Sequence, residues 1–177
     1  GVVTFLFTDI EGSTRLWEKA PDRMREALAR HDAVAREVVE RHRGRFVKST
    51  GDGIHAAFDE PSDALGTTID LLRGLADPRA TAGVTLQVRC GLHAGSDEQR
   101  DNDFFGRSVN RAARIMSVAH GGQVLLSQTV VDHLGDRLPP GATLRDLGRV
   151  RLRDLATPER VYQLVHPQLR LDFPALR

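Results

Sequence analysis

The sequence is poor in cysteine, in long apolar runs and in net charge, and each shortage excludes a class of protein. Its single cysteine, Cys90, leaves no internal disulfide to form and is typical of a reducing compartment, so we expect a cytoplasmic protein. No apolar run approaches the roughly 20 residues that span a bilayer, and no stretch of this sequence has the pattern of a signal-peptide h-region. A net charge of +1 favours neither nucleic acid nor an anionic membrane as a partner.

The remaining composition is that of an ordinary globular domain. The 177 residues are 40% hydrophobic and 28% charged, which is enough for one domain with a substantial core. We expect this domain to span residues 1–165, and we expect residues 166–177, which contain two prolines, to form a linker or tail. Because the chain starts at Gly1 and enters a strand pattern at once, we expect a piece of a longer protein with further domains.

Hydrophobic periodicity predicts an α+β fold. The expected strands and hairpins cover 2–8, 45–58, 84–92, 124–126, 144–147, 150–152 and 161–164. The expected helices begin at Ser13, Pro21, Pro61, Ser108 and Thr129, while 95–102 is expected to be an exposed loop. The early order βαββαβ is that of a ferredoxin-like core, an antiparallel sheet with helices on one face, here with extra C-terminal strands and a helix.

Two carboxylates stand at places where strands end or turn. Asp9 closes the first strand before a Glu-Gly-Ser-Thr loop and a helix, and Asp52 lies between Gly51 and Gly53 at the tip of the hairpin. Carboxylate oxygens suit Mg²⁺ or Mn²⁺, and the loop offers N–H groups that phosphate can accept from. The alternative is that Asp52 only forms the turn, and Asp9 only caps the approach to the helix.

A second polar cluster lies between Asp103 and Arg114. Asn110 and Arg114 are four residues apart on an expected helix, so they share one face, whereas Arg111 should point elsewhere. An amide and a guanidinium on one face can hold a ribose edge and a phosphate. The alternative is a solvated basic face without a ligand.

Three segments together resemble the class III adenylate cyclase catalytic domain of the bacterial type. They are Phe7 to Thr14, Lys48 to Gly53 and Asp103 to Arg114, and the segments Arg89 to Gly95 and Leu152 to Leu155 also match in place. Each motif alone is weak, but their order and spacing are specific. The resemblance covers roughly residues 2–164.

The resemblance implies a site with two divalent ions, Mg²⁺ or Mn²⁺, and ATP as substrate. It assigns metal binding to Asp9, Asp52 and the carbonyl of Ile10. It assigns the β- and γ-phosphates to Glu11, Gly12, Ser13 and Thr14, and a phosphate contact to Arg153, which stands near the position of a family lysine. It assigns base selection to Lys48 and Asp103, ribose orientation to Asn110, and charge stabilisation at the α-phosphorus to Arg114.

The implied reaction converts ATP to 3′,5′-cyclic AMP and pyrophosphate. A lysine donor and a carboxylate acceptor complement N1 and the 6-amino group of adenine, whereas guanine presents the reverse pattern. In the family, Asp9 and Asp52 would come from one subunit, and Lys48, Asp103, Asn110 and Arg114 from the other. The resemblance therefore implies a head-to-tail homodimer with two composite sites and an inactive monomer.

Two other interpretations remain open, and a third is disfavoured. The domain could be a nucleotide-binding or dimerisation module with little or no turnover, or a cyclase of different base choice. A diguanylate cyclase would need a glycine-glycine turn before an acidic motif, which this sequence lacks. The seven histidines show no ligand spacing, and His55 is expected to be a packed hairpin residue rather than a ligand.

Overall fold

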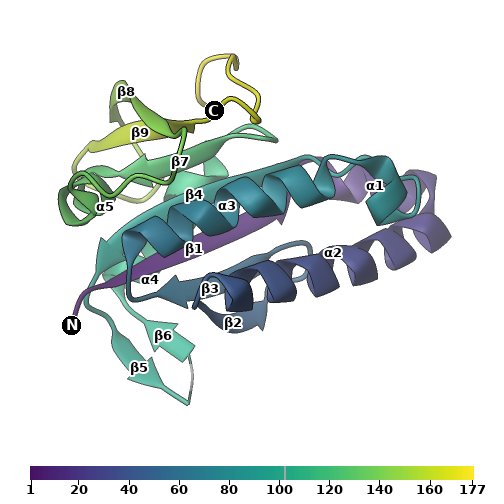
Figure 1. The fold of residues 1–177 in the computed structure, drawn as a ribbon, viewed down its shortest axis with the longest axis horizontal. Helices are drawn as coiled ribbons and strands as arrows, with labels where there is room; N and C mark the ends of the chain where they lie inside the picture. The colour runs from purple at the N-terminus through teal and green to yellow at the C-terminus, as the bar shows by residue number, and fades with distance from the viewer. Residues whose placement is uncertain (102) are drawn as a thin grey trace.

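The computed structural model describes residues 1–101 and 103–177. Within these residues, seven strands form one sheet in the order β2-β3-β1-β4-β7-β9-β8, and two short strands form a separate hairpin that projects from it (Figure 1). The strands of the sheet are β1 (Val3–Ile10), β2 (Arg45–Ser49), β3 (Ile54–Phe58), β4 (Val88–Gly95), β7 (Val124–Ser127), β8 (Thr143–Val150) and β9 (Glu159–Val165). The projecting hairpin consists of β5 (Glu98–Arg100) and β6 (Asp103–Phe105).

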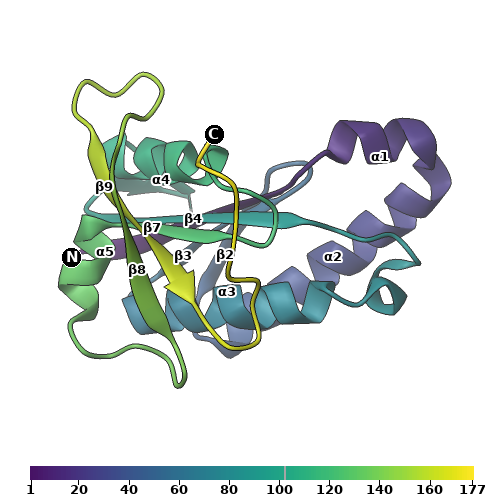
Figure 2. The same cartoon turned by 90° about the horizontal axis from the view of Figure 1, so that it is seen from above.

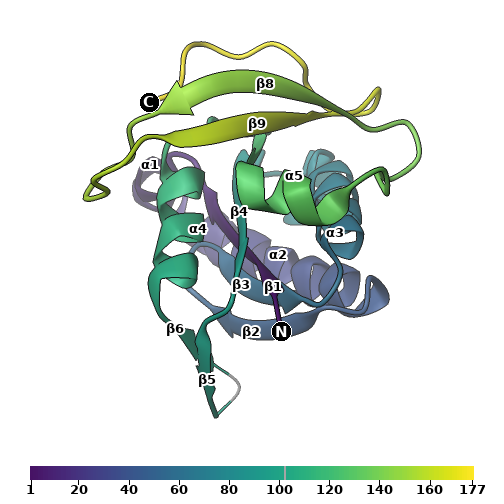
Figure 3. The same ribbon diagram turned by 90° about the vertical axis from the view of Figure 1, so that its left-hand side faces the viewer.

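Helices cover both faces of the central strands. The helices are α1 (Ser13–Lys19), α2 (Pro21–Arg41), α3 (Pro61–Leu75), α4 (Arg107–Ser117) and α5 (Gln128–Leu134), with a 3₁₀ turn, η1 (Pro78–Thr81). The long helices α2 and α3 lie on one side of β1 and β4, and α4 lies on the other side (Figure 3). We refer to these two sides as the α2–α3 face and the α4 face.

The α2–α3 face carries the main core. Alternate residues of the central strands, such as Leu6, Ala56 and Leu92, meet buried apolar side chains of both helices. These residues are completely buried, and their alternation is the period-2 pattern of a strand with one face against a core. The helices begin at Pro21 and Pro61, as predicted, because proline suits the first helical turn.

On the α4 face, the sheet packs closely against a single helix. An apolar cluster that contains Phe5, Phe104 and Ala112 joins the sheet to α4 and to the projecting hairpin. Gly91 permits this approach, because a Cβ atom at that position would lie 2.3 Å from the backbone nitrogen of Met116. The α4 face therefore places the polar side chains of α4 close to the sheet.

The predicted fold class is confirmed, with two additions. The strands β1, β3 and β4 pair antiparallel and are flanked by α2 and α3 on one face, as in a ferredoxin-like core. The extra C-terminal strands extend the sheet through a parallel pairing of β4 with β7. The helix α4 packs on the opposite face, which the βαββαβ pattern by itself does not indicate.

Three predicted boundaries are wrong. The strand expected from residue 84 begins at Val88, because β1 ends at Ile10, the partner of Val88, and 84–87 have no strand to pair with. Within the expected loop, residues 98–100 form β5, and Asn102 lies outside the described residues. The two strands expected at 144–147 and 150–152 are one strand, β8, whose bulge contains Gly148.

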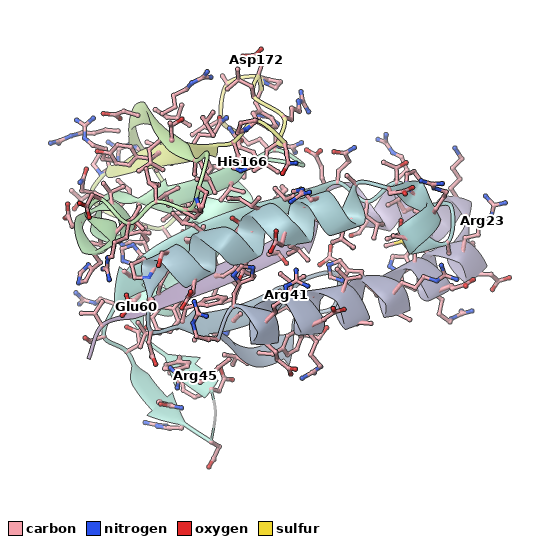
Figure 4. The ribbon with its side chains drawn as sticks, viewed as in Figure 1. Arg23, Arg41, Arg45, Glu60, His166 and Asp172 are labelled. Atoms are coloured by element: carbon pink, nitrogen blue, oxygen red, sulfur yellow. The ribbon has the colours of Figure 1, made fainter. Side chains whose placement is uncertain are left out.

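The C-terminal segment after β9 folds back across the sheet without forming a helix or strand (Figure 2). The side-chain amide of Gln163 donates to the carbonyl of Leu171 at 2.9 Å, and the amide of Arg177 donates to the carbonyl of Val118 at 3.2 Å. Figure 4 labels Asp172, which lies on the outer side of this segment and is exposed. In the part of the chain described here, none of the helices has the length and apolarity needed to cross a membrane.

Candidate active site

The first carboxylate, Asp9, lies on the α4 face near the end of β1. Its register partner on β4 is Arg89, whose Nε donates to Oδ1 of Asp9 at 2.6 Å and whose Nη2 donates to Oδ2. The same guanidinium donates to the carbonyl of Ser117, the last residue of α4. The hydrogen bond with Asp9 raises the pKa of Arg89, so this cation holds the carboxylate in one orientation.

The second carboxylate, Asp52, lies in the turn between β2 and β3. Gly51 has φ +94°, and a Cβ atom at Gly53 would lie 1.8 Å from the carbonyl oxygen of Thr8, so the turn is pressed against the end of β1. Ser13 donates its hydroxyl to Oδ2 of Asp52 at 2.7 Å. The helix α1 begins at Ser13, as predicted, and its N-cap position belongs to Gly12, in the left-handed region with φ +70°.

The donor atoms at this end of β1 fit a hard divalent cation. Two carboxylates from adjacent segments and the backbone carbonyl of Ile10 are oxygen ligands of the kind that Mg²⁺ and Mn²⁺ prefer. No group of three or more His, Cys, Asp or Glu side chains suited to a metal occurs among the described residues. A site with few protein ligands suits Mg²⁺, which keeps waters and takes phosphate oxygens from its substrate.

Lys48 and Asp103 meet although they lie 55 residues apart in the sequence. The ammonium of Lys48, on β2, donates to Oδ2 of Asp103, on β6, at 2.7 Å. The other carboxylate oxygen accepts the amide of Phe104 at 2.8 Å. The hydrogen bond from Lys48 lowers the pKa of Asp103, so this carboxylate is ionised at neutral pH. The structure therefore brings together the two residues assigned to base selection.

The helix α4 presents its polar residues in two directions. Arg114 donates to Asp154 at 2.9 Å, whereas Arg111 donates to Glu159 of β9 at 2.5 Å, so Arg111 points elsewhere, as predicted. Asn110 is exposed, one turn before Arg114. The carboxylate of Asp97 accepts hydrogen bonds from the backbone N–H groups of Ser108 and Val109. It thereby satisfies two N–H groups in the first turn of α4 that have no partner within the helix.

The residues assigned to phosphate binding occupy two places. Gly12, Ser13 and Thr14 lie at the start of α1, and Glu11 just before them accepts the amide of Gly121 at 3.3 Å and pairs with Arg177. Arg153 is exposed and lines a surface pocket of about 580 Å³ together with Asp154 and Arg177. No hydrogen bond or ion pair within the described part of the chain joins Arg153 to the loop that contains Glu11.

Sequence reasoning missed the partners of the site residues. Arg89 was noted only as part of a motif, because its position opposite Asp9 follows from the pairing of β1 with β4 and not from the sequence pattern. Asp154 follows Arg153 directly. Its backbone adopts the left-handed conformation, and its carboxylate pairs with Arg114. Arg177 gave no signal, because its contact with Glu11 spans 166 residues.

Comparison with known proteins identifies the family of this fold. The family described as the adenylate and guanylate cyclase catalytic domain matches residues 1–166. An uncharacterized protein of Mycobacterium tuberculosis is 42% identical over 100% of this chain and 60% of its own length. A receptor-type adenylate cyclase of Trypanosoma brucei brucei is 32% identical over 99% of this chain and 18% of its own length.

Solved structures agree as well. A structure from Trypanosoma brucei, described as an adenylate cyclase in its monomeric state, superposes with a TM-score of 0.86 at 30% identity and covers 99% of this chain and 92% of that chain. The chain spans about 60% of the length of the mycobacterial relatives that it matches. The match over residues 1–166, together with the confirmed fold, shows that the chain belongs to the adenylate and guanylate cyclase catalytic domain family, in its class III branch.

Proposed function

We propose that this domain is an adenylate cyclase that converts ATP to 3′,5′-cyclic AMP and pyrophosphate. The observation that carries the choice of ATP is the pair of Lys48 and Asp103, whose interacting atoms are 2.7 Å apart. A lysine donor can bond N1 of adenine while a carboxylate accepts from the 6-amino group. Guanine would place a carbonyl opposite the carboxylate and an N–H opposite the ammonium, so the same site disfavours GTP.

In the proposed reaction, the 3′-hydroxyl oxygen of ATP bonds to the α-phosphorus. The bond from this phosphorus to the bridging oxygen breaks, pyrophosphate leaves and the hydroxyl proton passes to water. Asp9 and Asp52, with the carbonyl of Ile10, would hold two divalent ions, Mg²⁺ or Mn²⁺. When bound, such ions lower the pKa of the attacking hydroxyl and neutralise charge on the leaving phosphates.

The side chains of this domain would orient the substrate. Asn110 would hold the ribose, and Arg114 would stabilise the charge that develops at the α-phosphorus. To do so, Arg114 must leave Asp154, which is feasible because the pair is exposed, with 37% of the Arg114 side chain and 68% of the Asp154 side chain accessible. An exposed ion pair contributes only about 0–1 kcal/mol, so a phosphate group can replace the carboxylate.

The proposed site requires two copies of the chain. Asp9, Asp52 and the loop from Glu11 to Thr14 would come from one subunit, and the groups on β2, β6 and α4 from its partner. In support, no hydrogen bond or ion pair in the described part of the chain links Asp9 or Asp52 to Lys48, Asp103, Asn110 or Arg114. A head-to-tail dimer with two equivalent sites would bring the two sets together.

The experiment is a nucleotide assay on the purified chain. ATP with Mn²⁺ or Mg²⁺ should give cyclic AMP and pyrophosphate in equal amounts, and activity should rise faster than linearly with protein concentration because only dimers are active. GTP should give much less cyclic product. Bound ATP without product at any protein concentration would contradict the proposal and favour a nucleotide-binding or dimerisation module. A preference for GTP would contradict the base assignment.

A further inference from the structure

His55 is a buried polar residue that the proposed reaction does not use. Its side chain is completely buried on β3, and neither Nδ1 nor Nε2 has a hydrogen-bond partner. Buried polar groups are almost always bonded, because losing water without a replacement destabilises the folded state. Since burial lowers the pKa of His55 to about 4, the ring is neutral and carries a single N–H group.

The position of His55 connects it to base recognition. Its register partner on β1 is Phe7, whose ring stacks on the imidazole at a centroid distance of 4.2 Å, and its partner on β2 is Lys48. Directly paired residues share one face of a sheet, so these three side chains form a row on the α4 face. Nδ1 of His55 lies 4.0 Å from Oδ1 of Asp103, beyond hydrogen-bond distance.

Each of the two oxygens of Asp103 already accepts a hydrogen bond from a group other than His55. Oδ2 accepts the ammonium of Lys48, and Oδ1 accepts the amide of Phe104. In the proposed complex, the ammonium of Lys48 would bond N1 of adenine and the 6-amino group would donate to Asp103 in its place, so the carboxylate would lose its charged donor and keep only the amide of Phe104 from this chain. The imidazole of His55 is unpartnered and lies 4.0 Å from Oδ1, so a small rotation of the carboxylate would let it supply a second donor from this chain.

We propose that His55 is a positioning residue that donates its Nδ1–H to Asp103 when adenine occupies the site. The inference rests on the proposed function, because it requires Lys48 and Asp103 to select the base. In this role the stacking on Phe7 fixes the plane of the imidazole, and the imidazole fixes the orientation of the carboxylate. His55 thereby contributes to the preference for ATP over GTP without touching the nucleotide.

Three substitutions test the role of the Nδ1 donor. His55→Asn keeps an amide donor near the place of Nδ1, His55→Gln moves the amide toward the place of Nε2, and His55→Leu keeps bulk without a donor. We expect KM for ATP to rise about 10-fold in His55→Leu and His55→Gln, with kcat changed less than about 3-fold, because base orientation and not chemistry is affected. The ratio of kcat/KM for ATP over GTP should fall by a similar factor.

His55→Asn should stay within about 3-fold of the wild-type KM, because it retains the donor. A wild-type ATP-to-GTP ratio in His55→Leu would overturn the proposal, and so would a defect in His55→Asn equal to that in His55→Leu. Thermal unfolding identifies any variant that fails to fold. For a chain that binds nucleotide without turning it over, the same comparison is made with ATP and GTP affinities, so failure of the cyclase reaction is distinguishable from failure of this inference.

A second measurement needs no substitution and no turnover. The ¹⁵N chemical shifts of the two ring nitrogens report which one carries the proton in the wild-type protein. With ATP bound, we expect the tautomer with the proton on Nδ1. A proton on Nε2 in the ATP complex would overturn the proposal, because Nδ1 could then only accept.

Discussion

The two faces of the central sheet are built by different physical means. The α2–α3 face is an apolar surface in which complete burial of residues such as Leu6 and Leu65 supplies the stability. The α4 face carries Asp9, His55 and Lys48, each with a charged group beside it on a neighbouring element. We propose that one face mainly sets the stability of the domain, and that the other sets what the domain binds.

One substitution on each face tests whether activity and stability depend on different faces, and the substitution of Asp52 should have the largest effect on activity. Asp52→Ala should lower cyclic AMP formation by at least about 1,000-fold, because it removes a carboxylate on which the proposed metal binding depends. It should leave the unfolding temperature near that of the wild type, since Asp52 lies in a turn. The assay is cyclic AMP production with ATP and Mn²⁺, followed by thermal unfolding of each variant.

Leu65→Ala is the matched truncation on the α2–α3 face. Leu65 is completely buried, so its loss should cost about 2–5 kcal/mol of unfolding free energy through lost contacts and a residual cavity. Folded Leu65→Ala protein should retain turnover per folded molecule. Substantial activity in Asp52→Ala, or loss of turnover in fully folded Leu65→Ala, would contradict the division between the faces.

The second effect concerns base choice on the α4 face. Lys48→Met should lower kcat/KM for ATP by about 100-fold, because Asp103 then faces the base without its partner donor. Lys19→Met, on an exposed residue of α1, is the control for the loss of one positive charge. Competition between ATP and GTP measures the result. An unchanged preference for ATP in Lys48→Met would remove Lys48 from base recognition.

The apolar face and the site motifs were the predictable parts of this molecule. Hydrophobic periodicity predicted the strands and helices of the α2–α3 face. Buried apolar residues, such as Leu92, recur along the sequence with the period of the element that contains them. The resemblance supplied Asp9, Asp52, Lys48 and Asp103 as site residues, and the structure places the last two in contact.

The pairing of charges was not predictable from the sequence. The chain has 25 Lys and Arg residues, and local periodicity does not indicate that Arg89 faces Asp9 across two strands or that Arg114 reaches Asp154. The alternation of apolar residues between 84 and 92 correctly predicted that Val84 and Leu86 are buried. A strand also needs a neighbour to pair with, and the pairing of β1 with β4 ends at Val88, so 84–87 are not part of the strand. Long-range partners follow from topology, which sequence patterns constrain only in part.

A third, moderate effect is the response of stability to pH, which should be greater on the α4 face. Burial lowers the pKa of His55 and of His93 to about 4, from 6.5 in the unfolded chain. The unfolded chain therefore binds more protons below pH 6.5, so the stability that these groups contribute is fully present above pH 6.5 and is lost as the pH falls toward 4.

The expected loss is about 2–3 kcal/mol for each histidine over that pH range, read as a falling unfolding free energy in urea titrations. His55→Leu should remove its share of the slope, whereas Leu65→Ala should lower stability by the same amount at every pH. Equal slopes in His55→Leu and the wild type would mean that the imidazole of His55 does not stay neutral on folding.

The smallest expected effect lies at the C-terminal segment. Arg177 pairs with Glu11, but half of the Arg177 side chain is exposed, so the pair should contribute only about 0–1 kcal/mol. Arg177→Ala should change KM for ATP less than about 3-fold, and high salt should remove the difference. A tenfold or larger rise in KM would show that the C-terminal segment belongs to the phosphate site.

In the proposed dimer, Asp52 of one subunit and Arg114 of the other act on the same ATP molecule. The most direct test mixes Asp52→Ala chains with Arg114→Ala chains, each inactive alone, and measures cyclic AMP after heterodimer formation is verified by mass spectrometry. Equal mixing should restore roughly a quarter of wild-type activity, because half of randomly formed dimers are mixed and each has one intact site of two. No recovery in a sample that contains the heterodimer would contradict the shared site.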